Sequence, residues 1–178
     1  MQLLSLRMPS SVAVWAPLPL RLMIAFGFLQ HGFSKLAAGP DHFAGILNAI
    51  GVPAADIMAR LTICAEILGG FAVLVGAFVT IAAIPMSTVL LVAATTVHLR
   101  YGFSSIKLLA VTASGAQFGP PGYETDLLYL ACLVVLIMFG AGPLSIDGFV
   151  RSRYDSAPSV ACAAASRAIG TRYGEHET

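Results

Sequence analysis

The chemistry available to this chain rests on eight ionisable side chains that lie inside or at the ends of strongly apolar stretches. Histidine exchanges protons near neutral pH, lysine stabilises developing negative charge, and carboxylates relay protons. Together such groups could bind a polar ligand and supply it with protons. In chain order they are His31, Lys35, Arg60, Glu66, His98, Arg100, Glu124 and Asp126.

Among these residues, Glu66 is expected to have the highest free-energy cost of burial. It lies about nine residues into the apolar run that begins near Ile57, which is about 13 Å along a helix. An ionisable group at the centre of a membrane helix costs about 2.5 to 3.5 kcal/mol on insertion scales. We therefore expect its carboxyl group to be protonated or paired.

Four apolar runs must position these side chains. The chain has 178 residues, of which 57% are hydrophobic and 11% charged, a composition too apolar for an ordinary soluble domain. Each run approaches the roughly 20 residues that a membrane-spanning helix needs. The sequence predicts an all-α integral membrane protein, a four-helix antiparallel bundle within one domain of residues 1–150. The predicted spans are 17–38, 57–79, 81–99 and 123–142.

Antiparallel topology brings the polar residues together. The ends of the first and third spans and the starts of the second and fourth meet at one membrane face. Gly27, His31 and Lys35 recur every four residues and so form one stripe of the first span. We predict a polar pocket at this face. Its candidate residues are His31, Lys35, Glu66 and His98, with Arg21, Arg100 and Glu124 as secondary members.

Simpler interpretations of single residues remain open. Lys35 and Arg100 lie at span ends, where long cationic side chains reach the headgroups. His98 suits the end of its own helix, and Glu124 and Asp126 suit the start of theirs, because of the helix dipole.

The remaining segments connect or follow the spans. Only about one residue separates the second and third spans, whereas SSIKLLAVT, between the third and fourth, is predicted as a short interfacial helix. The polar insertion QHGFSK favours a retained first span over a cleaved signal peptide. Residues 151–178 are predicted to form a flexible polar tail.

Several classes of protein are disfavoured by composition. A net charge of +1 gives no electrostatic case for nucleic acid as a partner. Cys64, Cys132 and Cys162 stand singly, so neither a zinc ribbon nor a thiol relay is supported.

The Lys and Arg residues near the span ends nearly balance across the membrane. We assign the termini to the cytoplasm. Several cations of the opposite face belong to the predicted pocket, so they do not count toward the excess of positive charge that marks the cytoplasmic side. The face of the termini holds Arg7, Arg21, Arg151 and Arg153, and the other holds Lys35, Arg60, Arg100 and Lys107.

Several short motifs, in order, resemble the DoxX family of small four-helix bacterial inner-membrane proteins. They are Arg21, QHGFSKL, AEILGG with Gly76 and Thr80, HLRYGF, GYETDLLYL and GAGPLSID. The resemblance covers residues 17–149 and implies a redox association at the inner membrane, because the family is named after a subunit of thiosulfate:quinone oxidoreductase. It also implies that the family's polar pattern falls on His31, Lys35, Glu66 and His98. Thr125 and Asp126 depart from the apolar residues that the family's pattern has after the glutamate of the fourth span, which is Glu124 here.

Three functions are compatible with these residues. The first is a membrane subunit of an oxidoreductase that passes electrons to quinone, with a partner subunit bringing the electrons. The second is a non-enzymatic membrane scaffold or small-solute binding protein. The third is metal or haem ligation by His31 and His98, for which no further ligand motif is present. Whether the chain is an enzyme stays open, as does its oligomeric state, a homo-oligomer included; the lipid bilayer is its expected environment.

Overall fold

The structure is a computed structural model and describes residues 10–155. It is mostly helical, with one small two-stranded sheet. The elements are α1 (Ser10–Ala13), α2 (Pro17–Ala38), α3 (Pro40–Ala49), α4 (Ala55–Val75), α5 (Val79–Ala93), the π-helix η1 (Ala94–His98), the 3₁₀ helix η2 (Leu99–Tyr101), β1 (Leu108–Thr112), β2 (Gly115–Phe118), α6 (Glu124–Phe139) and α7 (Ile146–Asp155).

Three helical segments of the described chain are long and apolar enough to cross a membrane: Ser11–Ala38, Ala55–Val75 and Val79–Tyr101. The fourth predicted span, 123–142, is represented by α6, which has 16 residues and so extends only about 24 Å. It ends at Phe139 and is followed by Gly140, whose φ of 80° lies in the left-handed region that favours glycine. The structure therefore shows three long apolar helices and a shorter fourth one, and the four-helix membrane bundle remains a prediction.

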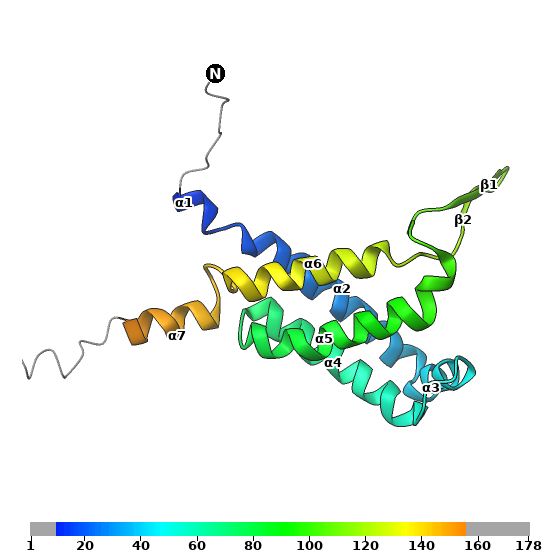
Figure 1. The fold of residues 1–178 in the computed structure, drawn as a ribbon, viewed down its shortest axis with the longest axis horizontal. Coiled ribbons are helices and arrows are strands. Elements are labelled where there is room, and N and C mark those ends of the chain that lie inside the picture. Colours follow the sequence, from blue (N-terminus) through cyan, green and yellow to red (C-terminus); the bar gives the residue numbers. More distant parts are fainter. Residues whose placement is uncertain (1–9, 156–178) are drawn as a thin grey trace, which may run out of the picture.

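The four main helices share one hydrophobic core. Both α2 and α5 contact α4 and α6, and the four helices run alongside one another in Figure 1. Core side chains come from each of them, as Ile24, Val73, Met86 and Leu133 illustrate. Although α6 is short, its Leu133 and Leu136 are fully buried in this core.

Glycines allow the helices to approach closely. A Cβ atom on Gly32 of α2 would lie 2.7 Å from Ile67 Cγ1 of α4, and one on Gly69 of α4 would lie 2.8 Å from Met86 Cγ of α5. Small residues have this role between helices in lipid, where packing replaces the hydrophobic drive of water.

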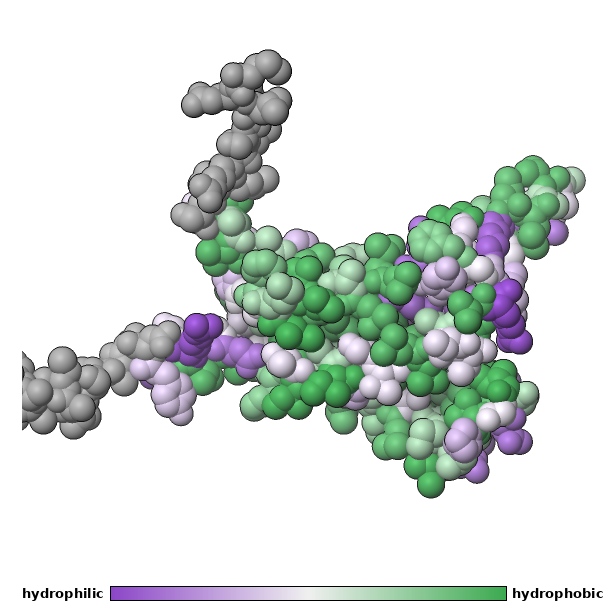
Figure 2. Space-filling view, viewed as in Figure 1, coloured by the Kyte–Doolittle hydropathy of each residue, from purple (hydrophilic) through white to green (hydrophobic). Residues whose placement is uncertain are grey.

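The outer surface of the helices is apolar. Phe26, Leu68 and Ile84 are each about two-thirds exposed, and hydrophobic residues cover most of the helical body in Figure 2. Such a large continuous apolar surface fits hydrocarbon and not water.

Two elements differ from the sequence prediction. Residues 39–56, read only as a connection, contain α3, which starts at Pro40 with Asp41 in its first turn and buries Ala44 and Leu47 beside Ala59 of α4. The helix predicted for SSIKLLAVT is wrong. Residues Leu108–Thr112 form β1, paired antiparallel with β2.

The turn between the strands explains this hairpin. Gly115 has a φ of 118°, a conformation that glycine adopts without steric cost. Thr112 Oγ1 donates to the Gly115 carbonyl at 3.1 Å and lies 2.8 Å from Ser114 Oγ. These contacts reverse the chain and bring the two segments side by side. The β-branched residues Val111 and Thr112 also favour a strand over a helix.

The two ends of the molecule differ. α1 and α7 lie at one end of the helices, and α3 and the hairpin lie at the other (Figure 1). Of the predicted flexible tail, residues 151–155 belong to α7, and residues 156–178 lie outside the described part of the chain.

Candidate functional site

An ion pair joins α2 to α4 near the end of the molecule that carries α3. Lys35 Nζ donates to Glu66 Oε1, and Glu66 is only 4% exposed. Gly32 makes this pair possible, because a Cβ there would lie 3.1 Å from Glu66 Cβ. The Lys35 ammonium also lies 5.1 Å from the centre of the Phe43 ring of α3. Of the two states expected for the deeply placed Glu66, the structure shows the paired one.

The second oxygen of this carboxylate has no partner. Glu66 Oε2 is buried and makes no hydrogen bond within the described residues. A buried carboxylate oxygen without a donor costs free energy. It can therefore accept a hydrogen bond or a proton from a group that reaches it.

A second polar pair joins the end of the third span to α6. His98 Nδ1 lies 2.6 Å from Asp126 Oδ2, and Asp126 is 6% exposed. His98 is the last residue of η1. Single π-helical turns within α-helices are frequent at functional sites. His98 lies at the end of such a turn.

Local hydrogen bonds accompany this π-helical turn. The hydroxyls of Thr95 and Thr96 donate to the carbonyls of Leu91 and Val92, at 2.8 and 2.7 Å. Such back-bonds bend helices. The sequence thus provides the local distortion that precedes His98.

The carboxylate of Asp126 fixes the orientation of the imidazole ring. A carboxylate accepts the hydrogen bond, so Nδ1 carries the proton, and Nε2 then has a lone pair in the neutral ring and a proton in the charged ring. The His98 side chain is 25% exposed. Its Nε2 is the atom through which it could exchange a proton with a ligand.

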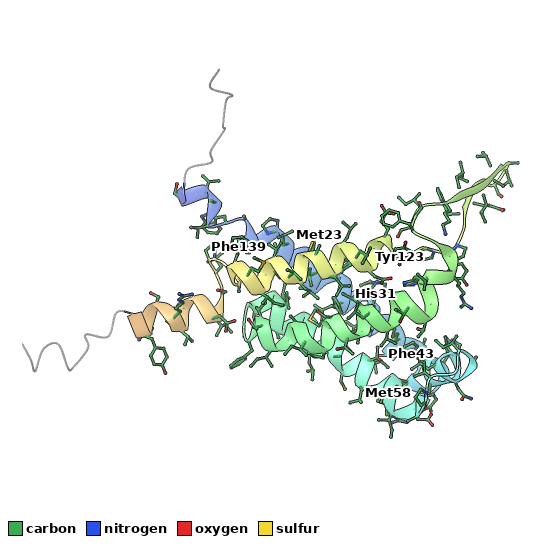
Figure 3. All side chains as sticks on the ribbon, in the orientation of Figure 1. Met23, His31, Phe43, Met58, Tyr123 and Phe139 are labelled. Atoms are coloured by element: carbon green, nitrogen blue, oxygen red, sulfur yellow. The ribbon has the colours of Figure 1, made fainter. Side chains whose placement is uncertain are left out.

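His31 does not join either pair. It is exposed on α2, where Figure 3 labels it, and no hydrogen bond or ion pair connects it to the described residues. Each step of four residues turns a helix by about 40°, so the predicted stripe drifts outward from Gly27, which is buried beneath the Tyr129 hydroxyl. Lys35 returns to the interior only because its side chain is long.

Arg21 lies at the opposite end of the helices from both pairs. It is 3% exposed and donates from Nη1 to the Ala141 carbonyl at 2.7 Å and from Nη2 to the Leu144 carbonyl at 2.9 Å. The geometry indicates that Arg21 holds the connection between α6 and α7.

The other two secondary candidates lie near the hairpin. The Arg100 guanidinium is exposed and stands 5.0 Å from the centre of the Tyr101 ring. Glu124 Oε2 accepts a hydrogen bond from the Ser105 amide at 2.9 Å. Neither side chain takes part in the two buried pairs.

Sequence reasoning listed Asp126 among the ionisable residues of this face but left it out of the predicted pocket, because the helix dipole already explains a carboxylate at a helix start. The signal was available in the topology. If the third and fourth helices are antiparallel, the end that carries His98 meets the start that carries Asp126. Asp41 and Arg60 form a further pair at 3.2 Å, but both side chains are largely exposed, and exposed pairs contribute little.

Within residues 10–155, no group of three or more His, Cys, Asp or Glu side chains is arranged to hold an ion. Cys64 and Cys132 are free thiols, and Cys162 lies outside the described residues.

Comparison with known proteins places this site in context. The model of the DoxX family matches residues 16–99, which include Lys35, Glu66 and His98. An uncharacterized membrane protein of Mycobacterium tuberculosis is 30% identical over 132 residues, covering 72% of this chain and 77% of the relative. An uncharacterized protein of Haemophilus influenzae is 27% identical over 139 residues, covering 76% and 83%. No solved structure matches the chain.

Proposed function

The chain belongs to the DoxX family of membrane proteins, and from this premise we propose that it is a quinone-linked membrane subunit of an oxidoreductase similar to thiosulfate:quinone oxidoreductase. The bacterial inner membrane is its proposed location, and cytoplasmic termini stay a prediction. The observation that carries the proposal is the Glu66 carboxylate. It is buried among apolar helices, paired through one oxygen and without a hydrogen-bond partner at the other.

The residues present fit the requirements of a quinone site. A bound quinone supplies an acceptor of two electrons and two protons, and its two carbonyl oxygens need hydrogen-bond donors. Glu66 Oε2 is an orphaned buried polar atom that would donate to a quinone carbonyl when the carboxyl group is protonated, since an ionised carboxylate only accepts. The His98 ring is partly exposed beyond its bond to Asp126. Both groups can hold a proton near an apolar surface, where a quinone ring would be soluble.

Each member of the two pairs has a distinct task in this proposal. Glu66 and His98 hold and pass protons, because carboxyl and imidazole groups do so near neutral pH. Lys35 stabilises negative charge beside Glu66, and Asp126 orients His98. His31, which lies exposed on α2 and contacts neither pair, has no task in this proposal. The electrons come from the partner subunit.

Replacing Glu66 by Gln tests the proposal. In membranes that contain the chain and its native partners, we expect Glu66→Gln to abolish quinone reduction by the associated oxidoreductase, because the amide cannot relay a proton. The matched control is Glu124→Gln, a glutamate at the same end whose Oε2 accepts only from the Ser105 amide. The control should retain activity.

The same membranes provide the contradicting outcomes. Both variants are solubilised in mild detergent, and the subunits recovered with the tagged chain are identified by mass spectrometry. The proposal fails if the wild-type chain recovers no oxidoreductase and binds no quinone. It also fails if Glu66→Gln retains full quinone reduction.

A non-enzymatic role as a membrane scaffold or small-solute binding protein is the second candidate. It is favoured by one observation, which is that both buried pairs join different helices: Lys35–Glu66 joins α2 to α4, and His98–Asp126 joins η1 to α6. Polar pairs of this kind fix how helices associate in lipid. In this interpretation the charges are structural.

Partner recovery and turnover, measured together with stability, separate the two functions. The scaffold role predicts that Glu66→Gln lowers the thermal unfolding temperature in detergent and the recovery of any partner together. The oxidoreductase role predicts a folded variant that recovers its partner and has lost turnover. A variant with unchanged unfolding and unchanged partner recovery would contradict the scaffold role.

A further inference from the structure

The hairpin of β1 and β2 is the least covered part of the described chain. All five residues of β1 and all four of β2 are exposed, and the hairpin extends away from the helices in Figure 1. An isolated two-stranded hairpin is only marginally stable in water. A hairpin of this kind is stabilised by a surface that covers one of its faces.

A bulge gives this hairpin one apolar face. Leu108 pairs with Phe118 and Val111 pairs with Ala116, with an irregularity between Leu108 and Ala110. Paired residues share a face of the sheet, and so do residues two apart in one strand. Leu108, Val111, Ala116 and Phe118 consequently lie on the same face, and Gln117 lies on the other. Without the bulge, Leu108 and Val111 would face opposite sides.

The side chains of this apolar face are strongly exposed. Val111 is 74% exposed, Phe118 61% and Leu108 58%. Figure 2 shows the hairpin as predominantly hydrophobic, with hydrophilic residues gathered at its base. The hairpin is thus amphipathic both between its two faces and from base to tip.

Its base is tied to the end of a membrane-spanning segment. Lys107, which precedes β1, donates from Nζ to the carbonyl of Tyr101, the last residue of the segment Val79–Tyr101. The Gly119 amide, which follows β2, donates to the Lys107 carbonyl at 2.8 Å. The hairpin therefore starts at the level where this helix leaves the hydrocarbon.

Aromatic and cationic side chains mark this level as a membrane interface. The Phe103 and Tyr123 rings meet edge to face with centres 5.5 Å apart, and the cations of Arg100 and Lys107 stand 5.0 and 6.0 Å from the centre of the Tyr101 ring. Aromatic rings are enriched at both surfaces of the bilayer. Among residues 10–155, no carboxylate forms an ion pair with Arg100 or Lys107.

Backbone hydrogen bonding limits how deeply the hairpin can enter the membrane. A two-stranded sheet has two open edges, and open edges do not occur within hydrocarbon. They are tolerated where water and headgroups can bond to them. A hairpin that contacts the bilayer would therefore lie at the boundary between headgroups and acyl chains, with its apolar face toward the acyl chains.

We propose that this hairpin is an interfacial membrane anchor, whose apolar face rests on the acyl chains while Arg100 and Lys107 bind the phosphate groups of anionic phospholipid. The anchor is continuous with the lipid-facing surface of the helices. It does not depend on the proposed oxidoreductase function.

Site-directed fluorescence on the full chain tests the anchor. Cys64, Cys132 and Cys162 are replaced by alanine, and a single cysteine carrying the dye NBD is placed by Val111→Cys or, as the matched control on the other face, by Gln117→Cys. The protein is reconstituted into vesicles of phosphatidylcholine and phosphatidylglycerol. We expect lipids brominated near the headgroup to quench position 111 severalfold more than position 117, and aqueous iodide to show the reverse order.

Two results would overturn the anchor. Equal access of iodide to both positions would mean that the hairpin stands in water. Protection of position 111 from both iodide and brominated lipid would mean that protein covers it, such as a second copy of this chain. Circular dichroism of each labelled protein, matching that of the unlabelled chain, shows that the fold is retained.

The two cations have a separate test. Arg100→Gln and Lys107→Gln each keep a hydrogen-bond donor and remove a charge. A cation near an anionic membrane surface strengthens association about fivefold, so in the double variant we expect position 111 to lose lipid quenching in vesicles with phosphatidylglycerol. In vesicles of phosphatidylcholine alone, the variant and the parent should agree. An unchanged response to phosphatidylglycerol in the double variant would overturn the binding of anionic lipid.

Discussion

At the scale of single residues, burial decides which charges need a partner. Glu66 is 4% exposed and Asp126 is 6% exposed, and each is paired with a cation or an imidazole from another helix. Arg60 and Asp41, both largely exposed, form a pair at 3.2 Å that contributes little to stability. The two buried pairs are consequently the places where a single substitution should be felt.

Removal of Lys35 gives the first prediction. Lys35→Met leaves the buried Glu66 carboxylate without its cation, and breaking such a pair costs about 3 to 5 kcal/mol. Because the Lys35 side chain is 24% exposed, we expect the lower end, about 3 kcal/mol, in detergent unfolding. The double variant Lys35→Met with Glu66→Leu should regain most of this loss. A double variant as unstable as the single one would contradict the pairing.

The His98–Asp126 contact gives the second prediction. In a double-mutant cycle of His98→Ala and Asp126→Ala, we expect a coupling of about 1 to 3 kcal/mol, since neighbouring residues in one hydrogen-bonded pair are not additive. Thermal unfolding of the four proteins measures it. His98→Ala combined with Thr125→Ala, which is exposed, is the control cycle and should show additive effects. Additivity in both cycles would show that the pair is not formed.

At the scale of elements, close helix contacts depend on glycine. Gly32 faces Ile67 and the Cβ of Glu66 across the contact of α2 with α4. A Cβ atom added to Gly32 would lie 3.3 Å from the amide nitrogen of Ile67, which belongs to the backbone and cannot rotate away. A methyl group at this position must separate the helices. The contact therefore sets the distance over which Lys35 reaches Glu66.

Gly32→Ala gives the third prediction. Overpacking of a closely packed contact costs about 1 to 3 kcal/mol, so we expect a lower unfolding temperature in detergent. The matched control is Gly45→Ala in α3, where a Cβ would meet nothing within 4 Å. The control should be neutral or stabilising, because alanine favours a helix by about 0.5 to 1 kcal/mol over glycine. Equal behaviour of the two variants would refute a close α2–α4 contact.

Sequence alone predicted the elements that depend on hydropathy and missed those that depend on local geometry. Long apolar runs identify helices because lipid requires the backbone to bond within each segment. The shortness of α6 depends on the conformation of Gly140, and the hairpin depends on the turn at Gly115. Neither conformation can be read from an apolar run.

For the candidate site, the sequence predicted which residues lie near one another but not which residues pair. Topology indicated which helix ends meet, so it brought Lys35 and Glu66 into one neighbourhood and His98 into the same half of the molecule. It could not assign partners, because His31 and Lys35 differ by 40° of helix rotation and in side-chain length. Asp126 was passed over because a helix dipole already explained a carboxylate in the first turn of α6.

At the scale of the whole molecule, the two ends have different tasks. One end holds both buried pairs, α3 and the hairpin. The other end is held by hydrogen bonds to the backbone. There Arg21 donates to the carbonyls of Ala141 and Leu144, and Asp147 accepts from the amides of Phe78 and Val79 at 2.9 and 3.2 Å. Arg21 and Asp147 thus fasten the end of α6 and the start of α7 to the other helices.

Arg21→Gln gives the fourth prediction, which tests this fastening. Glutamine is too short to reach both carbonyls, and each buried acceptor left without a donor costs about 1 to 3 kcal/mol. The loss should be local, because the core residues Leu133 and Leu136 of α6 keep their packing. Hydrogen exchange followed by mass spectrometry should therefore show faster exchange in residues 140–150 and unchanged exchange in α3. Arg60→Gln, which removes an exposed guanidinium that is 3.2 Å from Asp41, is the control and should leave residues 140–150 protected. If Arg21→Gln gave the same protection as this control, the buried guanidinium would not be what holds α6 and α7 in place.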